Sequence, residues 1–462
     1  MKASELREKV LRQLSYSPMP DQDMMIKSLC CFFENSADNG VFILQGYAGT
    51  GKTSLLAAFV KAFDSLKLPM VLLAPTGRAA KVFSSFANHV VYTIHKRIYR
   101  SASSNPSETS FFLAPNKDNN AIFIVDEASM IADVGGQVSL LEHLIRHIYS
   151  ASGCRLILVG DNAQLPPVGQ SDSPAMMPER LRQLGLDPLQ YVLERPVRQA
   201  VASGILYNAV RIRNCMIKNP LPTPKIWANG FADVEVVSSE FFVERLTDSY
   251  SEVGEEETIV ITRSNKRANL FNRGIRSMAL YAEEELQRGE RLVVAKNNYF
   301  WTKQIKELDF IANGDIIKVV WIGSKEEKYG HRFVDVDLEL ANSEISVSAK
   351  LMLDGLMSDN PSLTNTEMNK LYTDILAEKE GDELSKKVAT IQNDAYFNAV
   401  QVKYAYCLTC HKAQGGQWKH VYIDIGYLQS DMLGIDFYRW LYTAITRASE
   451  KVFFINPSII VE

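Results

Sequence analysis

The chain has 462 residues, which is too long for a single hydrophobic core and favours two to four domains. Hydrophobic residues make up 46% of it, and no apolar run approaches the roughly 20 residues needed to cross a bilayer, so no membrane partner is expected. The 50 basic and 54 acidic residues give a net charge of −4, which alone argues weakly against a nucleic-acid partner.

The N-terminus has the pattern of a charged amphipathic helix instead of a secretory signal. Six irregularly spaced cysteines then indicate a reduced, cytoplasmic setting. Short apolar runs follow, rich in β-branched residues and ending in Gly, Pro or Asp, as is typical of buried parallel strands. They lie at 41–46, 70–76, 121–127 and 155–161. With a helix between the first two, this is the doubly wound α/β pattern, which binds ligands at the carboxyl ends of its strands.

A second set of strand-like runs lies at 257–265, 420–426 and 451–457. Between them, from 314 to 400, alternating strands lead into a helical stretch, of which residues 351–394 carry 9 acidic and 4 basic residues. The sequence therefore predicts an α/β protein with two parallel-sheet units and a small β-rich insertion in the second. The expected ranges are 1–200 for the first domain with a short excursion at 96–120, 201–313 plus 401–462 for the second, and 314–400 for the insertion.

Residues 46–53, GYAGTGKT, satisfy the pattern G-x-x-x-x-G-K-[ST] between a strand and a helix. Backbone N–H groups of such a loop wrap phosphates, the lysine reaches the β and γ oxygens and the final hydroxyl ligates Mg²⁺. The predicted nucleotide-binding residues of the loop are Gly46, Ala48, Gly49, Thr50, Gly51, Lys52, Thr53 and Ser54. ATP and Mg²⁺ are the expected cofactors.

Two further strand ends supply acids and an amide. The strand before Asp126 delivers that carboxylate to the Mg²⁺ shell beside Thr53, and Glu127 is placed to polarise the attacking water. A base next to the metal ligand indicates hydrolysis instead of passive nucleotide binding. After the run at 155–161, the amide of Gln164 is suited to hydrogen-bond both the γ-phosphate and the water.

Residues 406–418, YCLTCHKAQGGQW, place Cys407, Cys410 and His411 almost at zinc-ligand spacing, and CxxC is also the spacing of a redox pair. Zinc needs four ligands, and no second Cys/His pair with suitable spacing lies nearby. A metal site, a redox pair and simple packing are the three interpretations of these cysteines.

Eight motifs occur in one order along the chain. They are GYAGTGKT, APTGRAAK (74–81), TIHK (93–96), VDEASM (125–130), GDNAQLPPVG (160–169), RPVRQ (195–199), TCHKAQGGQW (409–418) and LYTAITRA (441–448). In this order the chain resembles the superfamily 1B DNA helicases of the RecD-like, Dda-like branch, whose two RecA-like domains bind ATP between them. In that family the stretch around the two cysteines contacts DNA and nucleotide, which favours packing for both thiols.

The resemblance also implies roles for residues outside the P-loop. Gln22 corresponds to the glutamine that reads the adenine edge, Arg198 and Arg447 to two arginines that reach the γ-phosphate across the cleft. Gln414 and Gly415 would lie near the γ-phosphate. The implied DNA contacts are Pro75, Thr76, Arg78, His95, Asn265, Asn297, Thr409, His411 and Lys412. The excursion at 96–120 occupies the place of the family's strand-separating wedge, and 314–400 that of its SH3-like domain.

The expected activity is ATP hydrolysis stimulated by single-stranded DNA and coupled to 5′-to-3′ translocation and unwinding, in DNA repair or recombination. The expected partners are single-stranded DNA, single-strand/duplex junctions and proteins of those pathways, with the chain a monomer. Two alternatives belong to other classes: the helicase subunit of a helicase–nuclease assembly, and a regulatory P-loop ATPase that never moves on DNA.

Overall fold

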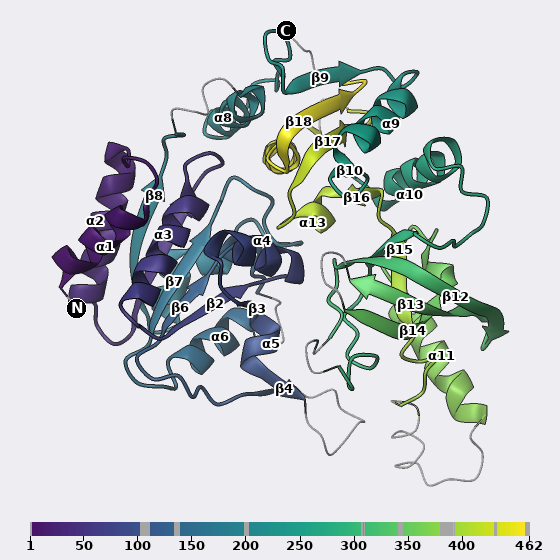
Figure 1. The fold of residues 1–462 in the computed structure, drawn as a ribbon, viewed down its shortest axis with the longest axis horizontal. Helices are drawn as coiled ribbons and strands as arrows, with labels where there is room; N and C mark the ends of the chain where they lie inside the picture. Colours follow the sequence, from purple (N-terminus) through teal and green to yellow (C-terminus); the bar gives the residue numbers. More distant parts are fainter. Residues whose placement is uncertain are drawn as a thin grey trace.

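The computed structural model of the protein describes residues 2–101, 111–133, 139–197, 203–305, 308, 310–340, 345–378, 391, 393–428 and 432–457. Within these ranges the chain forms two parallel sheets flanked by helices, a closed β-barrel and a two-stranded hairpin (Figure 1). No helix in the same ranges is long and apolar enough to cross a membrane. The predicted α/β class, with two RecA-like units and a small β-rich insertion, is confirmed.

The first sheet has six parallel strands in the order β3-β2-β6-β7-β1-β8. They are β1 Gly40–Gly46, β2 Met70–Ala74, β3 Val91–Thr93, β6 Ile122–Val125, β7 Arg155–Gly160 and β8 Asp187–Leu193. The first sheet's helices are α1 Ala3–Gln13, α2 Pro20–Asn35, α3 Lys52–Ser65, α4 Gly77–Ala87, α5 Ile94–Ile98, α6 Leu140–Ile148 and α7 Pro178–Gln183. On β1, Phe42 and Leu44 pack among α1, α2 and α3, while Val41 and Ile43 face the side of α6. Both faces are covered, which explains the continuous apolar run in the sequence.

The second sheet has five parallel strands in the order β16-β10-β17-β18-β9. They are β9 Val234–Val237, β10 Thr258–Thr262, β16 Cys407–Thr409, β17 Trp418–Asp424 and β18 Ala448–Ile455. Its helices are α8 Gly204–Met216, α9 Phe242–Val253, α10 Asn265–Gly274, α13 Cys410–Ala413 and α14 Ile435–Ile445. The core that contains α8, α13 and α14 also includes Ala163 and Leu165, from the loop after β7 of the first sheet. The two RecA-like units therefore share a hydrophobic core beside the carboxyl end of β7.

The insertion is a closed barrel of five strands, with α11 Asn365–Glu378 beside it (Figure 1). Its strands are β11 Arg291–Val294, β12 Ile316–Lys328, β13 His331–Leu340, β14 Ser346–Met352 and β15 Val400–Tyr404. The barrel is larger than the predicted range 314–400, because β11 pairs with both β12 and β15 to close it. That pairing joins strands more than 100 residues apart, which local sequence patterns do not report.

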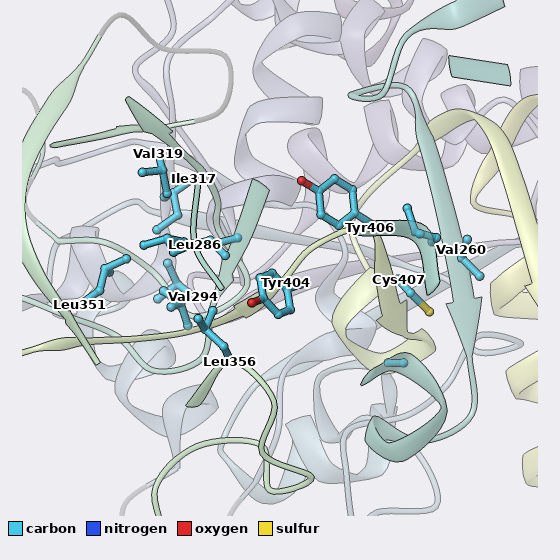
Figure 2. Close-up of a cluster of buried hydrophobic side chains, with 14 of the residues drawn as sticks. Val260, Leu286, Val294, Ile317, Val319, Leu351, Leu356, Tyr404, Tyr406 and Cys407 are labelled. Atoms are coloured by element: carbon cyan, nitrogen blue, oxygen red, sulfur yellow. The ribbon is translucent and has the colours of Figure 1, made fainter. Parts of the chain in front are cut away.

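The barrel and the second sheet also share one buried cluster. Figure 2 shows barrel side chains such as Ile317 and Val294 continuing through Tyr404 and Tyr406 to Cys407 and Val260 of the second sheet. The chain passes from β15 into β16 within two residues, and the shared cluster packs the barrel directly against the second RecA-like unit. Any movement of that unit is expected to carry the barrel with it.

In the excursion at 96–120, α5 leads into an antiparallel pair, β4 Tyr99–Ser101 with β5 Phe111–Leu113. Phe112 is 60% exposed on this hairpin. Residues 102–110, which join the two strands, lie outside the described residues. The described part of the excursion is thus a short hairpin with an exposed aromatic side chain.

Candidate functional site

The loop at 46–53 joins β1 to α3 and is shaped by two glycines with left-handed backbone, Gly49 at φ +73° and Gly51 at φ +84°. A Cβ atom at Gly51 would lie 2.6 Å from the Gln22 amide nitrogen, and one at Gly49 would lie 2.8 Å from Leu206. Only glycine tolerates this combination of left-handed backbone and close neighbours. The loop therefore wraps directly before a helix N-terminus, the arrangement in which backbone N–H groups bind phosphate.

Lys52 begins α3, and its ammonium donates to the carbonyl oxygens of Gly46 and Tyr47, the latter at 3.1 Å. Thr53 is partly buried on the first turn of α3, and Ser54 next to it is exposed. The Thr50 hydroxyl donates to the Tyr47 carbonyl at 2.8 Å, which closes the loop from inside. The structure thus gathers the predicted P-loop residues into one turn.

Gln22, at the start of α2, lies against the same loop. Its Nε2 donates to the Thr50 carbonyl at 3.0 Å, and its Oε1 accepts from the Met19 backbone N–H at 3.0 Å. Its side chain is only 2% exposed, which excludes a helix-surface glutamine. A role in reading the adenine edge stays a prediction.

Asp126 and Glu127 follow β6, the strand two places from β1 in the sheet. Burial, and then the charge of Glu127, raises the pKa of Asp126 to about 7. Glu127 has left-handed backbone at φ +52°, a strained conformation that clusters at functional sites. A divalent cation would relieve the unfavourable burial of the Asp126 carboxylate, and carboxylate and hydroxyl oxygens are donors that Mg²⁺ prefers. Asp126 and Thr53 therefore fit the predicted Mg²⁺ site.

The loop after β7 supplies Asp161 and Gln164, both buried. Asp161 accepts from the Ala163 backbone N–H at 2.9 Å and from the Tyr442 hydroxyl at 2.7 Å. Gln164 Oε1 is buried without a hydrogen-bond partner among the described residues. A buried acceptor of this kind costs free energy unless a donor reaches it. The unpaired Gln164 Oε1 fits the predicted contact with an attacking water. Together with the P-loop, this residue makes the site suitable for Mg²⁺-bound ATP.

Of the two predicted cross-cleft arginines, only Arg447 lies within the described residues, and it bonds within its own unit. The guanidinium of Arg447 is buried and donates to the carbonyls of Thr443 at 3.1 Å and Gly416 at 3.2 Å, within the second unit. Backbone carbonyls of its own domain satisfy it, so a contact with γ-phosphate requires a different side-chain conformation. Arg198 lies outside the described residues.

Gln414 and Gly415 both contact the first RecA-like unit, and their place near the γ-phosphate stays a prediction. Gln414 Nε2 donates to the Leu165 carbonyl at 2.7 Å, on the loop after β7 that also carries Gln164. A Cβ atom at Gly415, whose φ is +71°, would lie 3.0 Å from the Ala79 Cβ and 3.2 Å from the Thr76 hydroxyl. Gly415 therefore permits close approach between α13 and the N-terminus of α4, where the two RecA-like units meet (Figure 1).

Two side chains near the P-loop were not predicted. The Tyr442 hydroxyl accepts from the Ala48 backbone N–H at 2.7 Å, although it belongs to α14 of the second unit. The guanidinium of Arg213, on α8, lies 4.2 Å from the centre of the Tyr47 ring. Tyr442 lies within the motif LYTAITRA, so the sequence offered a signal for it, whereas Arg213 lies in a helical pattern without one.

Cys407 and Cys410 are both buried free thiols, and Figure 2 shows Cys407 within the apolar cluster. Cys407 approaches the Thr262 hydroxyl at 4.0 Å and Cys410 the Trp440 carbonyl at 3.6 Å. In the described parts of the chain, no three His, Cys, Asp or Glu side chains are grouped to hold a metal ion. Packing is therefore the role that the structure assigns to both thiols.

We expect Cys407 and Cys410 to resist alkylation in the folded protein, because the thiolate is the reactive form and burial raises the pKa of Cys410 to about 12 and that of Cys407 well above its usual value. The exposed Cys31 is the internal control and should react first. Mass spectrometry after maleimide treatment, with and without denaturant, measures this. Labelling of Cys407 in the native protein as fast as Cys31 would contradict the packing assignment.

The predicted DNA contacts on α4 lie where the two RecA-like units and the barrel meet. Thr76 caps α4 by accepting from the Ala79 N–H at 3.2 Å, and Pro75 precedes it. The Arg78 guanidinium lies 4.8 Å from the Trp418 ring centre and donates to the Gly314 carbonyl at 3.3 Å. Its other nitrogen, Nη1, is buried with no partner in the described residues, and burial lowers the pKa of Arg78 to about 10.

Lys412, on α13, is a second cation of this kind. Its ammonium is buried and, over the ranges that the structure describes, has no hydrogen-bond partner, so burial lowers its pKa. His411 beside it is exposed, and Thr409 is partly buried at the start of α13. Arg78 and Lys412 are thus cations with unused donors, which an anionic ligand would satisfy.

The structure gives less support to the other predicted DNA contacts. Asn297 is engaged in its own turn, donating to the Tyr299 hydroxyl at 3.1 Å and accepting from the Asn313 N–H at 2.7 Å. Burial lowers the pKa of His95, whose ring lies 5.6 Å from that of Tyr99. Asn265 is partly buried as the first residue of α10. Their roles as DNA contacts stay predictions.

Two family models match this chain, one in each RecA-like unit. The family described as "AAA domain" matches residues 21–202, and "UvrD-like helicase C-terminal domain" matches residues 404–455. The ATP-dependent RecD2 DNA helicase of Deinococcus radiodurans is 33% identical over 29% of this chain, and the matched part is 17% of that protein. Uncharacterized protein R530 of Acanthamoeba polyphaga mimivirus is 24% identical over 91% of this chain and 96% of its own length.

Solved structures of Pif1 helicase from Bacteroides are among those similar to this chain, at low sequence identity. The complex with ADP-AlF3 and single-stranded DNA is 14% identical with a TM-score of 0.48, covering 96% of this chain and 94% of that one. The complex bound to single-stranded DNA is 14% identical with a TM-score of 0.46, covering 96% and 93%.

The first family match contains the P-loop and the carboxyl ends of β6 and β7, and the second contains α13 and α14, which contact them. The RecD2 match adds a helicase relative to the same assignment. These matches and the eight ordered motifs support the assignment of the chain as a superfamily 1B P-loop helicase.

Proposed function

We propose that this protein is an ATP-dependent DNA helicase that hydrolyses ATP when bound to single-stranded DNA and moves along it in the 5′-to-3′ direction. One observation carries the proposal: the site for ATP lies where the two RecA-like units touch. The Ala48 N–H of the P-loop donates to the Tyr442 hydroxyl of α14, and Leu165 after β7 is bonded by Gln414 and Thr443 of the second unit.

A nucleotide site that spans two domains couples hydrolysis to domain movement. Charge that develops on the transferring phosphoryl group is stabilised only when donors from both sides are in place. ATP binding would therefore favour the closed cleft, and hydrolysis would release it. Repeated closure between two units that both contact one strand moves the protein along that strand when the two units hold it tightly in alternation.

Two buried cations support DNA as the partner on the neighbouring face. The unpaired nitrogen of Arg78 and the ammonium of Lys412 belong to different RecA-like units, on α4 and α13. Phosphate oxygens are suitable acceptors for both, since charge-assisted hydrogen bonds to phosphate recover part of the cost of burial. The exposed His411 offers a further donor beside them.

The direction of movement, unwinding by the short hairpin, and a role in DNA repair or recombination rest on the motif resemblance. So do a cytoplasmic location, a monomeric state and partners among repair or recombination proteins. Duplexes with a 5′ or a 3′ single-stranded tail test polarity and unwinding together. Displacement of the 3′-tailed substrate alone would reverse the proposed direction.

The first experiment is the ATPase rate with and without a single-stranded oligonucleotide, at low and moderate salt, with Lys52→Ala as the blank. We expect strong stimulation that weakens as salt rises, because cations released from the phosphates drive binding. A Lys52-dependent rate that ignores DNA and RNA would instead favour the regulatory ATPase. A nuclease recovered by pull-down would favour the helicase–nuclease assembly.

Lys412→Ala tests the proposed DNA face. We expect weaker binding of single-stranded oligonucleotide and a log–log slope of affinity against salt that is shallower by about 0.7, the value for one phosphate contact on a single strand. Fluorescence anisotropy over a salt series measures both. The matched control is Lys451→Ala, on β18, whose ammonium is already paired with Glu235 at 3.1 Å. Equal salt slopes for the two variants would remove Lys412 from the DNA face.

A further inference from the structure

The Tyr442 hydroxyl forms a hydrogen-bonded chain across the two RecA-like units. It accepts from the Ala48 backbone N–H at 2.7 Å and donates to the Asp161 carboxylate at 2.7 Å. Ala48 belongs to the P-loop and Asp161 follows β7, so both partners are in the first unit. Tyr442 comes from α14 in the second unit and is 1% exposed.

The donor and acceptor roles in this series of hydrogen bonds follow from the groups at its two ends. A backbone N–H can only donate, so the Tyr442 oxygen accepts from Ala48 and its hydrogen is left for Asp161. The second carboxylate oxygen of Asp161 accepts from the Ala163 N–H at 2.9 Å. Asp161 has no ion pair within the described ranges although it is 1% exposed. The tyrosine hydroxyl is therefore one of two donors that keep a buried carboxyl group satisfied.

Two neighbouring hydrogen bonds from the second RecA-like unit also hold the loop after β7. The Leu165 N–H donates to the Thr443 hydroxyl at 2.8 Å, and its carbonyl accepts from Gln414 at 2.7 Å. Gln164, whose Oε1 has no partner in the described chain, lies between Asp161 and Leu165. The position of Gln164 is thus set by bonds from α13 and α14, not by its own domain alone.

We propose that Tyr442 is a positioning residue for ATP hydrolysis: by linking the P-loop to Asp161, it fixes the loop that carries Gln164 only while the second RecA-like unit is docked. The inference deepens the proposed function and rests on it. It names the contact through which closure of the cleft reaches the hydrolytic site. Tyr442 itself touches neither the phosphates nor the metal in this role.

A tyrosine one turn earlier provides a matched control. Tyr438 is also on α14 and fully buried, but its hydroxyl has no hydrogen-bond partner among the described residues. Tyr442→Phe and Tyr438→Phe each remove one buried hydroxyl from the same helix and keep the ring. They differ in whether that hydroxyl links the P-loop to Asp161.

The test is a double-mutant cycle of Tyr442→Phe and Asp161→Asn, read as kcat and KM for ATP with saturating oligonucleotide. We expect each single variant to lower kcat about tenfold, as for a lost hydrogen bond to a charged group, with KM within about twofold of the parent. The double variant should lose no more than either single, since both break one link. Tyr438→Phe should keep the parent kcat.

A purely structural tyrosine would give another result. Tyr442→Phe would then keep the parent kcat, or its loss would multiply with that of Asp161→Asn to about a hundredfold, and either outcome overturns the inference. A parent rate that ignores DNA would overturn the proposed function, while the same cycle on the DNA-free rate still decides the role of Tyr442. A parent protein that hydrolyses no ATP would overturn both.

Discussion

Replacing Lys52 with alanine is expected to lower the DNA-stimulated ATPase rate by about a hundredfold or more. The ammonium is the only side-chain cation contributed by the loop at 46–53, and it sits at the N-terminus of α3, above Gly46 and Tyr47. In the reaction it would move from these carbonyls to the β and γ oxygens. Removing one preorganised donor from a transferring phosphoryl group costs on the order of 10²–10³ in rate.

The measurement for Lys52→Ala is steady-state phosphate release, with binding of a fluorescent ATP analogue followed in parallel. Lys61→Ala is the matched control, because Lys61 is exposed on the same helix α3 and lies outside the loop at 46–53. We expect the control to keep the parent rate and both variants to keep the parent DNA affinity. A Lys52→Ala protein that still hydrolyses ATP at the parent rate would place the phosphates outside this loop.

Glu127→Gln is expected to lower kcat by roughly 10²–10⁴ while nucleotide binding is retained, since general-base catalysis supplies a factor of this size. The substitution keeps the shape of the side chain and removes only its ability to accept a proton. Glu127 has left-handed backbone at φ +52°, whereas Asp126 directly follows the extended strand β6. The two neighbouring acids are therefore suited to separate tasks.

Single-turnover hydrolysis with prebound ATP separates the chemical step of Glu127→Gln from binding. Glu179→Gln on α7 serves as the control, because its carboxylate is exposed and its ion-pair partner among the described residues is Arg182 at 3.7 Å. We expect the control to match the parent within about twofold. Hydrolysis by Glu127→Gln at the parent rate would mean that another group polarises the water.

The nucleotide site was largely readable from the sequence. Its residues come from one contiguous loop and from the ends of two strands, and each carries a local signal: glycines before Lys52, and acids after an apolar run at Asp126. Parallel strands bring their carboxyl ends to one edge of a sheet, so local signals were enough to place these residues together. Strands β3, β8 and β9 were not predicted, because they are short or partly exposed and lack a continuous apolar run.

The barrel was predicted as a small β-rich insertion, but its boundaries were not. Alternating residues predict strands and leave their partners undetermined. Closure of the barrel depends on β11, which pairs with β15 more than 100 residues later, and that pairing moved 291–294 out of the second RecA-like unit. The choice among metal site, redox pair and packing for Cys407 and Cys410 also needed their surroundings, because spacing alone does not report burial.

The sequence by itself determined the chemistry of the ATP site, since residue types at fixed spacing on adjacent strand ends are local properties. Only the tertiary structure decided which side chains cross between the two RecA-like units. Gln414 bonds Leu165 and Tyr442 reaches Ala48, whereas Arg447 is held by Thr443 and Gly416 of its own unit. Contacts between segments almost 400 residues apart depend on how two domains pack, and no short stretch of sequence encodes that geometry.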